Sequence, residues 1–185
     1  MTTRILCLGN ELVHDDGVGI RIGRILMQLP LPDGVRVELA PQLGFDLLDV
    51  VASADRIVLV DAMTTGRPPG TCEVLDGRAI ERYRACAPAS HSIGIAELME
   101  VARKLAPQRD PATLHFVGVE GTSFCDYGME LSPEVAAAVP VAVDAILRLL
   151  GADAAVLAAG KTASERSITT VPSVQTLLDR PEATR

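Results

Sequence analysis

The chain has few aromatic residues and no tryptophan: Phe, Tyr and Trp together make up 3% of its 185 residues. A core without large rings has to be filled by Leu, Val, Ile and Ala, which suits parallel strands covered by helices. The sequence also lacks an apolar run long enough to span a bilayer, and its first apolar run is too short for a signal peptide. We therefore expect a cytoplasmic protein that does not insert into membranes.

Paired cysteines and a basic surplus are absent as well. Cys7, Cys72, Cys86 and Cys125 form no C-x-x-C pair and lie far apart in the sequence. This pattern excludes a zinc ribbon and argues against a disulfide framework. The formal net charge is −7 and no basic stripe is present, so nucleic acid is a poor partner.

The length fits one domain. We assign a single α/β domain to residues 1–150, because strand and helix patterns are clear there. Residues 151–185 lack strong periodicity and are rich in Ala, Ser and Thr. We expect this C-terminal tail to be mobile or loosely docked, and the whole chain to be a monomer.

Strand and helix patterns alternate, which predicts an α/β fold arranged as a three-layer helix–sheet–helix sandwich. The gap between Asp61 and Thr71 is too short for a crossover helix, so we expect antiparallel pairing there. The expected strands are Arg4–Leu8, Val35–Leu39, Arg56–Asp61, Thr71–Leu75 and Thr113–Val119; the expected helices run from Gly17 to Leu29, Leu43 to Val51, Ile93 to Leu105 and Pro133 to Leu150.

The loop Gly9–Gly19 concentrates charge between the first strand and the first helix. It carries Glu11, His14, Asp15 and Asp16. In an open α/β sheet, ligands bind at this end of the strands. Phosphate prefers bare backbone N–H groups there, and acidic side chains repel it. The loop is therefore predicted to meet a cation or a polar peptide. Within it, Asp15 is interpreted either as a helper of the site or as the N-cap of the first helix.

Two further polar residues also lie at the boundaries of predicted strands and helices. Asp61 ends the third strand, and His91 precedes the helix expected from Ile93. In a parallel sheet, Asp16, Asp61 and His91 can converge at one edge. Carboxylates with an imidazole suit Ni²⁺ or Zn²⁺, and three protein ligands leave open positions. The alternatives are helix N-terminal charge for Asp16, an end-of-strand turn for Asp61 and an ordinary loop histidine for His91.

A nucleotide site is a second interpretation of the same loop, because Gly17–Gly23 spells G-x-G-x-x-x-G. A dinucleotide fingerprint begins directly after its strand, whereas here the acidic segment Gly9–Asp16 intervenes. We interpret these glycines as allowing close packing of the helix on the sheet.

A serine or cysteine nucleophile is a third interpretation, because Cys86 and Ser90 lie close to His91 in the sequence. Such a nucleophile needs a base within hydrogen-bond reach and an orienting group, which sequence proximity does not provide. The chain also contains no G-x-S-x-G elbow. We disfavour this reading.

Four blocks of the sequence form a pattern in this order: Gly9-Asn10 with Asp15–Gly19, Val58–Ala62, Ser90-His91, and Gly118–Glu120 with Glu130–Val135. Together they resemble the blocks of the hydrogenase maturation endopeptidases, peptidase family M52. One stretch departs from the family pattern: Ala40–Gly44 stands where many members carry a D-x-G-T-like sequence, which affects substrate-selecting contacts rather than the metal ligands.

The resemblance implies a function and a site. Such enzymes remove a C-terminal extension from the large-subunit precursor of [NiFe]-hydrogenase after nickel insertion. It implies that Asp16, Asp61 and His91 are the catalytic and metal-binding residues, that the nickel is supplied by the precursor, and that the sheet is twisted, five-stranded and mostly parallel. The alternatives are a non-catalytic chaperone for the large subunit and, less favoured, a nucleotide-binding domain.

Overall fold

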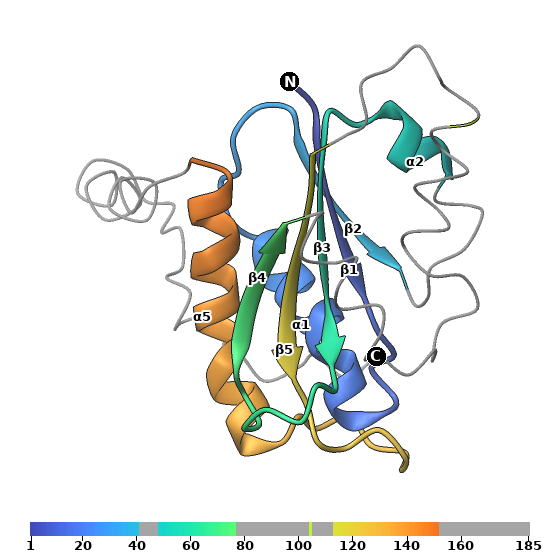
Figure 1. Cartoon of the computed structure of the whole chain (residues 1–185), viewed down its shortest axis with the longest axis vertical. Helices are drawn as coiled ribbons and strands as arrows, with labels where there is room; N and C mark the ends of the chain where they lie inside the picture. The colour runs from blue at the N-terminus through green and yellow to red at the C-terminus, as the bar shows by residue number, and fades with distance from the viewer. Residues whose placement is uncertain (41–47, 77–103, 105–112, 152–185) are drawn as a thin grey trace.

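The computed structural model describes residues 1–40, 48–76, 104 and 113–151. In this part of the chain, five strands form one sheet in the order β2-β1-β3-β5-β4. The elements, in chain order, are β1 (Thr3–Leu8), the 3-10 turn η1 (His14–Gly17), α1 (Val18–Leu26), β2 (Val35–Ala40), α2 (Leu48–Ser53), β3 (Arg56–Met63), β4 (Cys72–Asp76), β5 (Thr113–Glu120) and α5 (Pro133–Leu149) (Figure 1).

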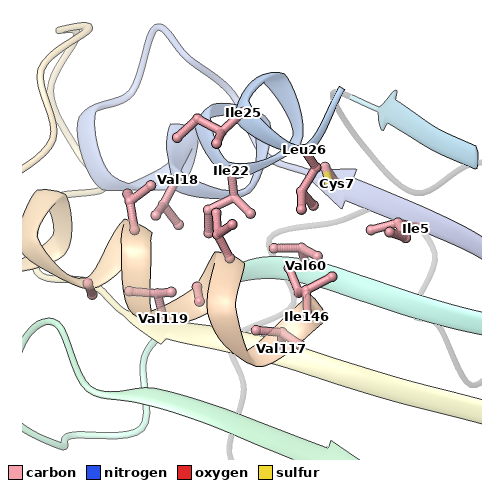
Figure 2. Packing of buried hydrophobic residues seen from close by; sticks show 14 of the residues in the cluster. Ile5, Cys7, Val18, Ile22, Ile25, Leu26, Val60, Val117, Val119 and Ile146 are labelled. Carbon is pink, nitrogen blue, oxygen red and sulfur yellow. The ribbon is translucent and has the colours of Figure 1, made fainter. Parts of the chain in front are cut away.

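The central strands are buried on both faces, and their side chains alternate between two apolar clusters. Val58 and Val60 of β3 join the larger cluster with α1 and α5, whereas Ile57 and Leu59 join the smaller one with α2. Figure 2 shows Ile22 of α1, Val60 of β3 and Ile146 of α5 together in the larger cluster. Helices therefore cover both faces, and the predicted α/β sandwich is confirmed.

The neighbouring strands of the described sheet are parallel except for β4 and β5. β1 pairs in parallel with β2 and β3, and β3 pairs in parallel with β5. β4 is antiparallel, as the short gap predicted. Its partner, however, is β5 and not the preceding strand β3. The mostly parallel, five-stranded sheet that the family resemblance implied is thus present.

Some expected elements lie outside the described residues. This applies to the first part of the helix expected at 43–51, of which α2 forms the end, and to the helix expected at 93–105 apart from Lys104, which is helical. The tail is described only to Gly151, so its expected mobility stays a prediction. Within the described ranges, no helix is both long enough and apolar enough to cross a membrane.

Candidate active site

The parallel strands β1, β3 and β5 end at Leu8, Met63 and Glu120, at the lower end of the view in Figure 1. We call this end of the sheet the carboxyl edge. Asp61 lies opposite Gly118 in the β3–β5 register, and η1, which carries Asp16, contacts β3. The strand was expected to end at Asp61 but continues to Met63. The structure brings the turn that carries Asp16 and the last residues of β3, including Asp61, to the same edge.

A sharp turn after β1 presents Asp16. Gly9 has φ +127°, and a side chain there would collide with the Asp16 carbonyl oxygen, so glycine is required at this position. The Asn10 amide then donates to Asp16 Oδ2 at 2.9 Å, and the Asn10 side-chain oxygen accepts from the Leu12 amide at 3.0 Å. Asp16 remains partly exposed. Its carboxylate is thus oriented by the backbone while still accessible to a ligand.

The glycines of α1 serve packing, as predicted. A Cβ on Gly19 would lie 2.6 Å from the Val60 carbonyl oxygen and closer still to that of Leu8. A Cβ on Gly23 would approach Cys7 Sγ to 2.8 Å. The helix therefore lies directly on β1 and β3, and this close contact fixes η1 above the end of β3.

Asp15 has a different environment from its neighbour Asp16. Its side chain is fully buried, with 0% exposure. The carboxylate accepts hydrogen bonds from the amides of Thr122 (2.9 Å), Ser123 (3.1 Å) and Ser132 (2.7 Å), and from the Ser132 hydroxyl (3.1 Å). Burial raises the pKa of Asp15, but the four hydrogen bonds outweigh it and hold the pKa below its ordinary value of 3.8.

The possible N-cap role of Asp15 is therefore wrong. The cap residue of α1 is Gly17, with no side-chain cap hydrogen bond, and that of η1 is Val13. The reason is tertiary: the loop after β5 and the start of α5 together offer Asp15 more donors than the adjacent helix turn could. Asp15 connects η1 to both of these segments.

Asp61 is 7% exposed and closes the apolar run of β3. Its Oδ1 accepts the Ala62 amide at 2.8 Å. The Asp61 charge also acts on the buried Cys7 thiol: burial raises the Cys7 pKa, and Asp61 raises it further. Cys7 is therefore a neutral core residue, as expected of a small buried hydrophobe.

Glu120 is a buried acid that the sequence placed in a matching block, Gly118–Glu120, but without a role. It is 2% exposed at the end of β5. Its carboxylate accepts the amides of Thr65 (2.7 Å) and Gly66 (2.8 Å) and the Thr65 hydroxyl (2.7 Å). Glu120 thus fixes the loop that follows Asp61. The available signal was the one that identified Asp61: a carboxylate that ends an apolar strand.

Two other ionisable residues of the opening loop make different contacts, Glu11 with α1 and His14 with a loop far away in the sequence. Glu11 forms a two-point ion pair with Arg24 of α1, at 2.6 and 2.9 Å. His14 lies 2.9 Å, through Nδ1, from the Glu130 carbonyl oxygen. Its φ is +43°, a left-handed conformation that histidine tolerates better than most residues.

His91 lies outside the described residues, as do Cys86 and Ser90 of the alternative nucleophile reading. Among the residues that are described, no three His, Cys, Asp or Glu side chains form a group that could hold a metal. Since the third expected ligand is not among them, the three-residue site of Asp16, Asp61 and His91 stays a prediction.

Comparison with known proteins identifies the family. A family model described as "Hydrogenase maturation protease" matches residues 24–149. The chain belongs to the hydrogenase maturation protease family. Protein FrxA of Pyrococcus furiosus is 35% identical over 140 residues, which cover 74% of this chain and 96% of FrxA.

Solved structures of the family have the same fold. The [NiFe] hydrogenase maturation protease HybD from Thermococcus kodakarensis has a TM-score of 0.69 at 33% identity, covering 81% of this chain and 99% of that one. The hydrogenase maturating endopeptidase HybD from Escherichia coli has a TM-score of 0.73 at 28% identity, covering 81% and 92%. The family match includes Asp61 and His91 and begins after Asp16.

Proposed function

We propose that this chain removes the C-terminal extension of a [NiFe]-hydrogenase large-subunit precursor after nickel insertion. The observation that carries the proposal is that two carboxylates lie at the carboxyl edge, Asp16 on the turn η1 and Asp61 near the end of β3, in a member of the hydrogenase maturation protease family. One solved relative is named a [NiFe] hydrogenase maturation protease. A cytoplasmic location and a monomeric state belong to the same proposal.

The donor chemistry agrees with recognition of substrate nickel. Asp16 and Asp61 supply carboxylate oxygens, which accept backbone amides at 2.9 Å (Asn10) and 2.8 Å (Ala62), and His91 is proposed to supply the imidazole. Such a mixed set suits Ni²⁺. Nickel carried by the precursor would thereby place the scissile bond at the carboxyl edge and polarise its carbonyl.

The hydrolysis itself needs a water molecule and a base. Water adds to the scissile carbonyl carbon while a carboxylate removes its proton, and that proton passes to the departing amine nitrogen as the C–N bond breaks. Asp16 is the better base of the two carboxylates. It is partly exposed, whereas Asp61 is only 7% exposed.

The test is cleavage of two forms of the purified precursor, one loaded with nickel and one without it, followed by intact-mass spectrometry. We expect loss of the C-terminal extension only from the nickel-loaded form. Binding of both forms with no change in mass would contradict proteolysis and favour the chaperone alternative.

Two variants test the site separately. We expect His91→Ala and Asp16→Asn each to lower the cleavage rate at least about 100-fold. Asp33→Asn, an exposed acid just before β2 and far from the carboxyl edge, is the matched control and should cleave normally. A normal rate in His91→Ala would show that the proposed metal ligands are wrong.

A further inference from the structure

Three large apolar side chains are exposed on two loops beside Asp16: Leu12 (54% exposed), Tyr127 (89%) and Met129 (62%). The loops pair through their backbones, since the Gly128 amide donates to the Leu12 carbonyl at 2.9 Å and the His14 amide donates to the Gly128 carbonyl at 2.7 Å. We call the surface formed by residues 10–14 and 126–130 the two-loop platform. Exposed Tyr and Met side chains are enriched at protein–protein contacts.

The platform is held in place although it consists of loops. The Asp15 carboxylate connects the first loop to Thr122, Ser123 and Ser132. The His14 ring lies on Gly128, where a side chain of any other residue would collide with it. A surface fixed in advance loses little conformational entropy on binding, so its exposed side chains can contribute affinity efficiently.

A groove continues from the platform. Met129 and Glu11 lie on its wall, and the groove runs between the start of α1 and the first half of α5, past Gly17 and Pro140, with a volume of about 840 Å³. This volume lies in the range of pockets that enclose a drug-sized ligand, so it is large enough for a few side chains of a protein partner.

Charged residues of both signs border the apolar surface. Asp126 and Glu130 are exposed on the platform, and Arg21 lines the groove. The groove wall also includes Ala136 and Pro140 of α5. The matching partner surface therefore has apolar side chains surrounded by charged residues.

We propose that the two-loop platform and its groove dock the body of the protein substrate, away from the bond that is cleaved. The occupant is the hydrogenase precursor, so this inference rests on the proposed function. Continuity with the site supports the assignment: Leu12 is four residues before Asp16, and Gly17 of the groove wall directly follows it. Binding energy from such remote contacts presents the scissile segment to the catalytic groups.

The experiment compares the double variant Tyr127→Ser/Met129→Ser with Met27→Ser in cleavage of the nickel-loaded precursor. Met27 is 58% exposed at the end of α1, which matches Met129 in residue type and exposure but lies off the platform. We expect KM of the double variant to rise about tenfold or more, with kcat within about twofold of wild type. Met27→Ser should behave as wild type.

The two hypotheses fail differently. If the wild-type chain binds the precursor in calorimetry without cleaving it, and the double variant loses binding, the docking surface is supported and the proposed proteolysis is contradicted. If the wild type cleaves and KM of the double variant is unchanged, the docking surface is wrong. Wild-type self-association in sedimentation equilibrium that the double variant abolishes, with KM unchanged, would assign the platform to a second copy of this chain instead.

Discussion

Asp15 and Asp16 are adjacent residues of the same type, yet they have opposite environments. Asp15 is fully buried, and four donors from distant parts of the chain satisfy its carboxylate. Asp16 is partly exposed and accepts the amide of the nearby Asn10. The difference shows how the site is built: one carboxylate connects the loops around the carboxyl edge, and the next is left available to a ligand.

The largest expected effect is on stability, from Asp15→Ala. The substitution leaves the amides of Thr122, Ser123 and Ser132, whose hydrogen bonds to Asp15 are partly buried, without their acceptor. We expect the free energy of unfolding to fall by about 3 to 5 kcal/mol, measured by urea denaturation. Asp33→Ala, on the exposed turn before β2, is the control. A loss below about 1 kcal/mol would mean that Asp15 does not connect the loops.

Asp16→Asn should change stability little and lower activity strongly, in contrast to the loss of stability expected for Asp15→Ala. The amide side chain still offers an oxygen to the Asn10 amide, so the interaction at 2.9 Å has a replacement acceptor. We expect the free energy of unfolding to change by less than about 1 kcal/mol, while precursor cleavage falls at least about 100-fold. Parallel urea titrations and cleavage assays check this. Equal losses of stability in the Asp15 and Asp16 variants would remove the contrast.

Glu120→Gln extends the comparison to the acid that fixes the loop after β3. In the wild type, both carboxylate oxygens of Glu120 accept hydrogen bonds from Thr65 and Gly66. The glutamine side chain has only one acceptor oxygen for these donors. We expect a loss of about 1 to 2 kcal/mol of stability. Glu38→Gln removes a half-exposed partner of Arg4 at 3.2 Å and should cost less than about 1 kcal/mol. Similar losses in the two variants would contradict an anchoring role for Glu120.

The smallest expected effect is a pH dependence. The pKa of Asp15 is lower in the folded chain than its ordinary value of 3.8. The folded state therefore favours the carboxylate, so its stabilisation is complete above that value and is lost as the pH falls through the folded-state pKa. Wild type should lose more stability than Asp15→Asn between about pH 5 and pH 2, in urea titrations of the metal-free protein. If the stability of wild type and of Asp15→Asn fell in parallel with pH, the pH dependence would not come from Asp15.

Local sequence patterns were sufficient to predict most helices and strands of the described fold. Continuous apolar runs predicted β1 and β3, because strands buried on both faces need them. The Ser-Pro-Glu start predicted α5, which begins at Pro133. The partner of β4 was not predictable in this way, since the spacing after Asp61 limits the direction of a strand but not its neighbour in the sheet.

For the site, the sequence supplied Asp16 in the loop after the first strand and Asp61 at the end of an apolar run, and the parallel sheet places η1 and the end of β3 at one edge. It left the role of Asp15 open and gave no role to Glu120. The Asp15 carboxylate accepts the amide of Thr122, which is 107 residues away, and the Glu120 carboxylate accepts the amide of Thr65, which is 55 residues away. Partners at such separations are set by the packing of the whole domain.

By itself, the sequence determined the alternation of strands and helices, the glycines that let α1 lie on the sheet, and the acidic turn after β1, because each depends on neighbouring residues and on steric limits of the backbone. Only the tertiary structure decided which of two adjacent aspartates is buried and which is accessible. That choice depends on donors brought by the loop after β5 and by α5, and a buried carboxylate is stable only where such donors surround it.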